Sequence, residues 1–112
     1  MIVTVADVRT YHSLAGVRDE EIIAHLESAK RDFNLVSFYS DDDKKEAICC
    51  QTIIYVSPIL WARGMVNMPG YETIYSNAGD IETFQSIYQK RIDGVLSRGS
   101  NRSYGKNVWG SV

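Results

Sequence analysis

The most constraining feature of this sequence is an uncharged, largely apolar stretch from Ala47 to Ala62. As a helix, turning by about 100° per residue, this stretch places large apolar side chains in every direction around its axis and has no clear solvent-facing side. A chain of 112 residues supports one domain with a modest core. We therefore expect this helix to be covered by the chain's other helices or by a second chain.

Local signals mark both ends of this helix. Ser40 followed by Asp41, Asp42 and Asp43 is typical of a helix N-terminus, where a hydroxyl and nearby acids satisfy free backbone donors. Arg63-Gly64 is a typical helix end. Pro58 removes one backbone hydrogen bond inside the stretch. We expect the helix to kink at Pro58 or to end there and restart.

Two helices are predicted before it. Thr4 and Asp7 have the spacing of a capping box, which predicts a short first helix ending near Ser13. The residues from Arg18 to Glu21 place three acids in the first turn of a second helix, where the helix dipole favours them. The apolar residues of that helix recur in steps of four and three, which predicts one buried face. They are Ile22, Leu26, Ala29, Phe33 and Val36.

A fourth helix is predicted after a long loop. Residues 64–76 show neither helical nor alternating order, and Asn77 to Asp80 provides caps. The helix that follows is amphipathic and ends at Gly94 or Gly99. The fold class is all-α, a small bundle of about four helices with a long loop before the last helix and an extended C-terminal tail. We divide the chain into a helical domain, residues 1–97, and a flexible docking tail, residues 98–112.

Residues that could perform chemistry are few, and we expect no enzyme. Cys49 and Cys50 are adjacent, lack the spacing of a redox or zinc pair, and are predicted to be buried, protonated and unreactive. His12 and His25 have no nearby partners that would form a metal site. We expect no cofactor, no metal and no catalytic residues. The chain has no cationic, cleavable start and no apolar run of the roughly 18 residues that span a membrane, so we expect a soluble protein.

The distribution of charge indicates a binding end. The whole chain carries a net charge of −2, but from residue 90 onward five basic residues stand against one acid, Asp93. Together with the aromatic residues near the C-terminus, this predicts a tail that docks on another surface, with Trp109 as its anchor. Folding of the tail onto its own bundle, or a disordered tail, is the alternative. The predicted docking residues are Arg98, Arg102, Tyr104, Lys106 and Trp109.

A subunit interface is predicted along the apolar helix and the loop after it. The methionines and the tyrosine of the loop are adaptable contact residues. They either contact a neighbouring subunit or the next component, or only cover the bundle. The predicted interface residues are Ile53, Val56, Leu60, Trp61, Met65, Met68 and Tyr71.

The order of these helices resembles the small helical head-to-tail connectors, also called adaptor or head-completion proteins, of tailed bacteriophages. The resemblance lies in the capped opening from Thr4 to Val8, the acidic start from Asp19 to Ile23, the long apolar helix from Ala47, and the closing helix with its tail. It implies a structural virion protein, made in the bacterial cytoplasm and located in the neck. There it forms a ring, typically a dodecamer, below the portal.

The resemblance also implies what the ring would contact. It would continue the DNA channel, dock a stopper or tail-completion protein, and bind the portal through the C-terminal tail, with no membrane involved. A net-acidic body suits a channel through which DNA passes without being held. The alternative is a small helical nucleic-acid-binding regulator that contacts phosphates through Arg98, Arg102 and Lys106.

Overall fold

The protein is a bundle of helices packed around one central helix. The structure is a computed structural model that describes residues 1–63 and 80–104, with side chains for residues 1–63 and 80–99. Its helices are α1 (Val5–Tyr11), α2 (Asp19–Asp32), α3 (Asp41–Ala62) and α5 (Ile81–Tyr104), and the described residues contain no strand. The all-α prediction is confirmed. The predicted loop at 64–76 and the part of the predicted tail after Tyr104 lie outside the described residues.

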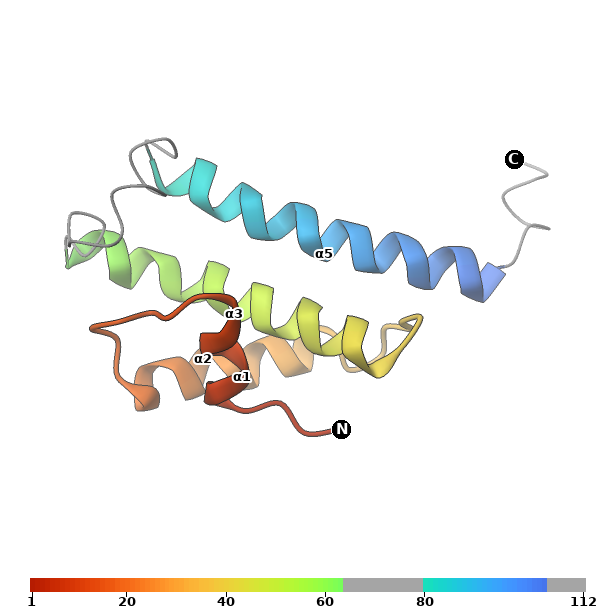
Figure 1. The fold of residues 1–112 in the computed structure, drawn as a ribbon, viewed down its shortest axis with the longest axis horizontal. Helices are drawn as coiled ribbons and strands as arrows, with labels where there is room; N and C mark the ends of the chain where they lie inside the picture. The colour runs from red at the N-terminus through yellow and green to blue at the C-terminus, as the bar shows by residue number, and fades with distance from the viewer. Residues whose placement is uncertain (64–79, 105–112) are drawn as a thin grey trace.

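The apolar helix α3 occupies the middle of the molecule. In Figure 1, α5 runs along one side of α3, while α1 and α2 lie on the other side. The contacts between helices agree, since α3 packs against each of the other three helices. A single apolar core therefore runs through the chain, and α3 supplies its largest share. Of the two coverings expected for α3, the structure contains the one made by its own chain.

The predicted helix starts are confirmed. The Thr4 amide donates to the Asp7 carboxylate at 2.9 Å, and the Asp7 amide donates to the Thr4 hydroxyl at 3.3 Å, which completes a capping box on α1. At the start of α3 the Asp43 amide donates to the Ser40 hydroxyl at 3.1 Å. On the predicted face of α2 all residues except Val36 are buried, because α2 ends at Asp32 and Val36 belongs to the connection that follows.

Helix α3 continues through Pro58, so it does not end and restart there. Proline cannot donate to the Ile54 carbonyl. The Ser57 hydroxyl donates to that carbonyl instead, at 2.6 Å, and itself accepts from the Gln85 side chain of α5 at 2.8 Å. A side chain thus replaces the backbone bond that proline removes, which allows the helix to remain one element.

The predicted end of the last helix was wrong, because α5 includes both Gly94 and Gly99 and continues to Tyr104. Gly99 is buried against the connection between α2 and α3. A Cβ atom placed on it would lie 2.6 Å from the Ser37 carbonyl oxygen and 3.1 Å from the Phe38 Cα. Gly99 therefore permits a close approach of two backbones and does not terminate the helix.

Candidate functional site

The first residue of the predicted docking tail, Arg98, lies within the last helix. Arg98 belongs to α5, and its guanidinium donates to both carboxylate oxygens of Asp43 at 2.9 and 3.0 Å. These hydrogen bonds lower the pKa of the nearly buried Asp43 carboxyl. Arg98 therefore joins the last helix to the start of α3.

Of the other four predicted docking residues, two lie in the last helix and two lie outside the described residues. Arg102 and Tyr104 lie in the last turn of α5, whose end reaches one end of the molecule in Figure 1. Lys106 and Trp109 lie outside the described residues. Arg91, another basic residue of the positively charged C-terminal part of the sequence, also contacts residues of the helical bundle. It donates to Glu46 at 2.9 Å and lies over the Tyr11 ring at 4.9 Å.

The predicted subunit interface on α3 needs correction. Ile53 and Val56 are 0% exposed and Leu60 is 1% exposed, all within a single chain, because α3 is covered by α1, α2 and α5. These three side chains have no surface left to offer to a second copy. Trp61 is half-buried against Phe84, with ring centroids 5.1 Å apart. The remaining predicted interface residues, Met65, Met68 and Tyr71, lie outside the described residues.

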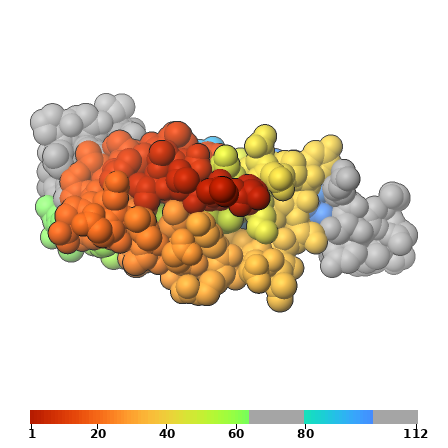
Figure 2. All heavy atoms as spheres, turned by 90° about the horizontal axis from the view of Figure 1, so that it is seen from below, coloured from red at the N-terminus to blue at the C-terminus, as the bar shows by residue number. Residues whose placement is uncertain are grey.

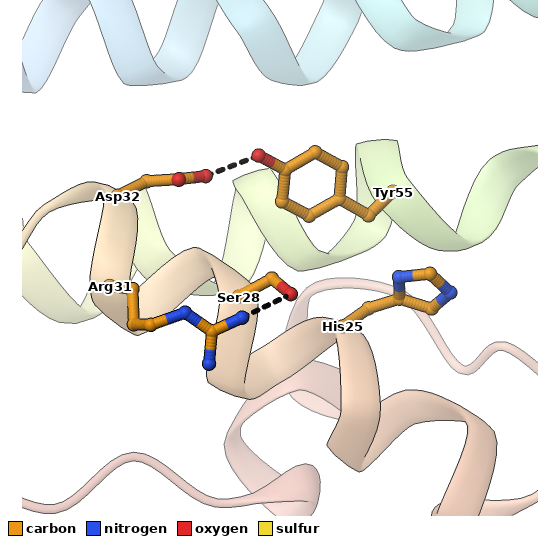
Figure 3. Close-up of a pocket in the computed structure, with 5 residues that line it drawn as sticks. All are labelled: His25, Ser28, Arg31, Asp32 and Tyr55. Carbon is orange, nitrogen blue, oxygen red and sulfur yellow. Dashed lines mark hydrogen bonds between the residues drawn. The ribbon is translucent and has the colours of Figure 1, made fainter.

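A polar hollow of about 350 Å³ lies between α2 and α3. Figure 3 shows its five lining residues, His25, Ser28, Arg31, Asp32 and Tyr55. The Tyr55 hydroxyl donates to the Asp32 carboxylate, and this bond is the main cause of the raised pKa of Tyr55. The rings of His25 and Tyr55 lie 6.1 Å apart. No motif in the sequence marks this hollow, because it joins Tyr55 to residues that lie 23 to 30 positions earlier in the chain.

One hydrogen bond of this hollow links two helices, the others lie within α2, and none of them activates a nucleophile. The Ser28 hydroxyl donates to the Ala24 carbonyl at 3.4 Å and accepts from Arg31 at 3.1 Å. An activated serine instead needs its hydroxyl bonded to a base, and the bonds that Ser28 makes are directed elsewhere. The Tyr55–Asp32 bond connects α3 to the end of α2. We interpret the hollow as a polar contact between these two helices.

Three buried titratable residues, Cys49, Cys50 and His12, are held in their uncharged forms at neutral pH. The predicted burial of Cys49 and Cys50 is confirmed. Burial raises the pKa values of both to about 12, so both are thiols at neutral pH. His12 Nδ1 accepts from the Leu14 amide at 3.0 Å, and burial lowers the pKa of His12 to about 4. This bond supports a left-handed backbone at Leu14, where φ is 51°.

The described part of the chain contains no group of three or more His, Cys, Asp or Glu side chains placed to hold a metal ion. None of its helices is long and apolar enough to cross a membrane. Comparison with known proteins found no match to a family model, to a curated protein or to a solved structure.

Proposed function

We propose that this chain is a structural virion protein of a tailed bacteriophage, a head-to-tail adaptor that forms a ring below the portal. In this role it continues the DNA channel and docks the stopper or tail-completion protein. The observation that carries the proposal is the order of the helices. A short capped helix, an acid-started amphipathic helix, a central apolar helix and a long closing helix follow one another. This is the order by which the sequence resembles the connectors.

The closed core changes how a ring would form. Because α3 is covered within its own chain, assembly is not driven by an exposed core and has to use surface contacts. Copies in a ring bury two different patches on their neighbours, a contact that closes by rotation. A portal that presents many equivalent sites favours such assembly, since weak contacts repeated on one template add through their effective concentration.

The end of α5 supports docking through the C-terminal residues. The Arg98–Asp43 pair and the close approach of Gly99 to Ser37 hold the end of this helix against the body. The residues that follow are thus joined to a fixed point. Without Arg98, the docking set comprises Arg102, Tyr104, Lys106 and Trp109.

Charge favours the adaptor over the nucleic-acid-binding regulator. The chain is net acidic, and like charge suppresses the phosphate contacts that dominate affinity for nucleic acids. Arg91 and Arg98, two of the five basic residues after position 89, are bonded to Glu46 and Asp43. Fewer cations are therefore free for phosphates than the sequence indicated.

The experiment is portal binding by a shortened chain. Deletion of residues 105–112 leaves every described contact in place, whereas a deletion from residue 98 would also remove the Arg98–Asp43 pair. We expect the shortened chain to keep its circular dichroism spectrum and melting temperature and to lose co-sedimentation with the portal of the same phage. Trp109→Ala should lose about 2 to 4 kcal/mol of binding free energy if Trp109 is a hot spot, with Trp109→Phe as the milder control. Full portal affinity after the deletion would refute the docking assignment.

A further inference from the structure

A second hollow lies where the N-terminal segment crosses the end of α2 and the start of α3. Its volume is about 240 Å³. Figure 2 views the face on which these three segments meet. The lining combines apolar with basic and amide side chains, and the residues used below are Ile2, Val3, Ile48, Lys30, Asn34 and Lys44. We call this hollow the N-terminal groove.

The apolar side of the groove is partly open to water. Val3 and Ile48 are buried and belong to the core, whereas Ile2 is 78% exposed, and Met1, which also lines the groove, is 56% exposed. Apolar surface that remains in water gains free energy when another apolar group covers it. The groove thus presents exposed apolar side chains, next to buried core residues, that an apolar group of a ligand would cover.

The charged side of the groove is basic in a protein that is net acidic. Lys44 makes no ion pair or side-chain hydrogen bond with any residue that the structure describes, and it is only half exposed. Lys30 is bonded to Glu27 at 3.2 Å, but none of the described residues that line the groove carries a carboxylate. A ligand that brought a carboxylate to Lys44 would form a pair that the chain leaves unmade.

We propose that the N-terminal groove binds an extended acidic segment of a partner protein. An apolar side chain of that segment rests against Val3, Ile48 and Ile2, and a neighbouring carboxylate pairs with Lys44. This site deepens the proposed function and rests on it for the existence of a protein partner. It uses a surface different from the C-terminal residues, so one adaptor would hold two partners at two sites.

A second copy of the chain fits the groove less well than a foreign segment. Among the described residues, one exposed apolar side chain with acidic neighbours is Ile23 on α2, which is 46% exposed. Two of its acidic neighbours are already bonded, Asp19 to Arg9 at 2.8 Å and Glu27 to Lys30. A second copy would have to break these pairs in order to offer their carboxylates.

The test uses a short, fluorescently labelled peptide with a central leucine between glutamates, and a counterpart with lysines in place of the glutamates. Binding to the full chain is followed by fluorescence anisotropy, and the site is mapped by amide chemical shifts. We expect saturable binding of the acidic peptide alone, with the largest shifts at Val3, Lys44 and Ile48. Lys44→Glu should weaken binding at least tenfold.

The matched control is Lys90→Glu, which makes the same charge change on the exposed face of α5 and should leave the affinity unchanged. Lys44→Glu also suits the first turn of α3, where an acid is favoured, so the fold should be preserved. Equal affinity of the two variants, or no binding of the acidic peptide to the wild-type chain, would overturn the proposal. So would a loss of self-association in Lys44→Glu alone, because the occupant would then be a second copy.

The two proposals fail in different ways. If the deletion of residues 105–112 leaves portal binding intact while Lys44→Glu still abolishes peptide binding, the portal assignment falls and the groove stands. If portal binding depends on residues 105–112 but Lys44→Glu and Lys90→Glu bind peptide alike, only the groove assignment falls.

Discussion

Gly99 is the position at which the seating of α5 is most directly testable, because a methyl group has no room there. A Cβ atom on Gly99 would meet backbone atoms of Ser37 and Phe38 at 2.6 and 3.1 Å. Backbone atoms cannot rotate away as the end of a flexible side chain does. Gly94 lies on the same helix, and a Cβ atom there would meet no atom within 4 Å. Gly99→Ala and Gly94→Ala therefore differ mainly in this one contact.

The expected sizes follow from two opposing effects. Alanine stabilises a helix interior by about 1 kcal/mol relative to glycine, so Gly94→Ala should raise the free energy of unfolding by about that amount. At Gly99 the same gain is opposed by overpacking, which costs roughly 1 to 3 kcal/mol and more where a backbone has to move. We expect Gly99→Ala to lower the free energy of unfolding by about 1 to 2 kcal/mol, a separation of about 2 to 3 kcal/mol between the variants.

Urea denaturation followed by far-ultraviolet circular dichroism measures both variants against the wild type. In a domain of this size each kcal/mol corresponds to a change of about 4 to 8 °C in melting temperature, so thermal unfolding gives a second measurement. Gly94→Ala is the control for helix propensity alone. If Gly99→Ala proved as stable as Gly94→Ala, the close packing of α5 on the α2–α3 connection would be refuted.

Three further substitutions or treatments test the packing. The pKa of His12 is about 4 in the folded chain, so His12 takes up a proton more readily when the chain is unfolded. The free energy of unfolding should therefore fall by up to about 3 kcal/mol as the pH drops from about 6.5 to 4. His12→Asn keeps an acceptor for the Leu14 amide and should lose that part of the dependence; an unchanged pH profile would contradict the assignment. Cys49 and Cys50 should resist a thiol reagent at neutral pH until urea unfolds the chain, and labelling of the folded chain would show that they are accessible. Ile53→Asp should lower the free energy of unfolding by roughly 4 kcal/mol or more, measured by thermal unfolding. Ile87→Asp, at a side chain that is 44% exposed, should change the free energy of unfolding by about 0.5 kcal/mol or less. Similar effects of the two substitutions would contradict the buried position of Ile53.

The helix starts could be predicted because their signals are local. Thr4 and Asp7, or Ser40 and Asp43, satisfy backbone donors within one turn, so their spacing is sufficient. The central position of α3 was also predictable, since a helix that is apolar all round needs cover on every side. What the sequence left open was the source of that cover, because this depends on how α1, α2 and α5 pack.

The features that could not be predicted depend on residues far apart in the chain. Glycine is common at helix ends, and only the contact with Ser37 explains why Gly99 lies inside α5. The sequence predicts that Arg98 is a free cation, because its partner in the fold, Asp43, lies 55 residues earlier. Pro58 indicates a kink or a break, but the helix continues through it, with the Ser57 hydroxyl bonded to the Ile54 carbonyl and to Gln85 of α5, 28 residues later. In each case a tertiary contact outweighed a valid local preference.

The most direct test of the adaptor proposal is native mass spectrometry of the full chain, alone and mixed with the portal protein that the proposal gives it as a partner. We expect a folded chain whose core needs no partner, and with the portal a complex that contains a fixed number of copies set by the portal's symmetry. A portal whose mass stays unchanged in the presence of excess chain would contradict the proposal.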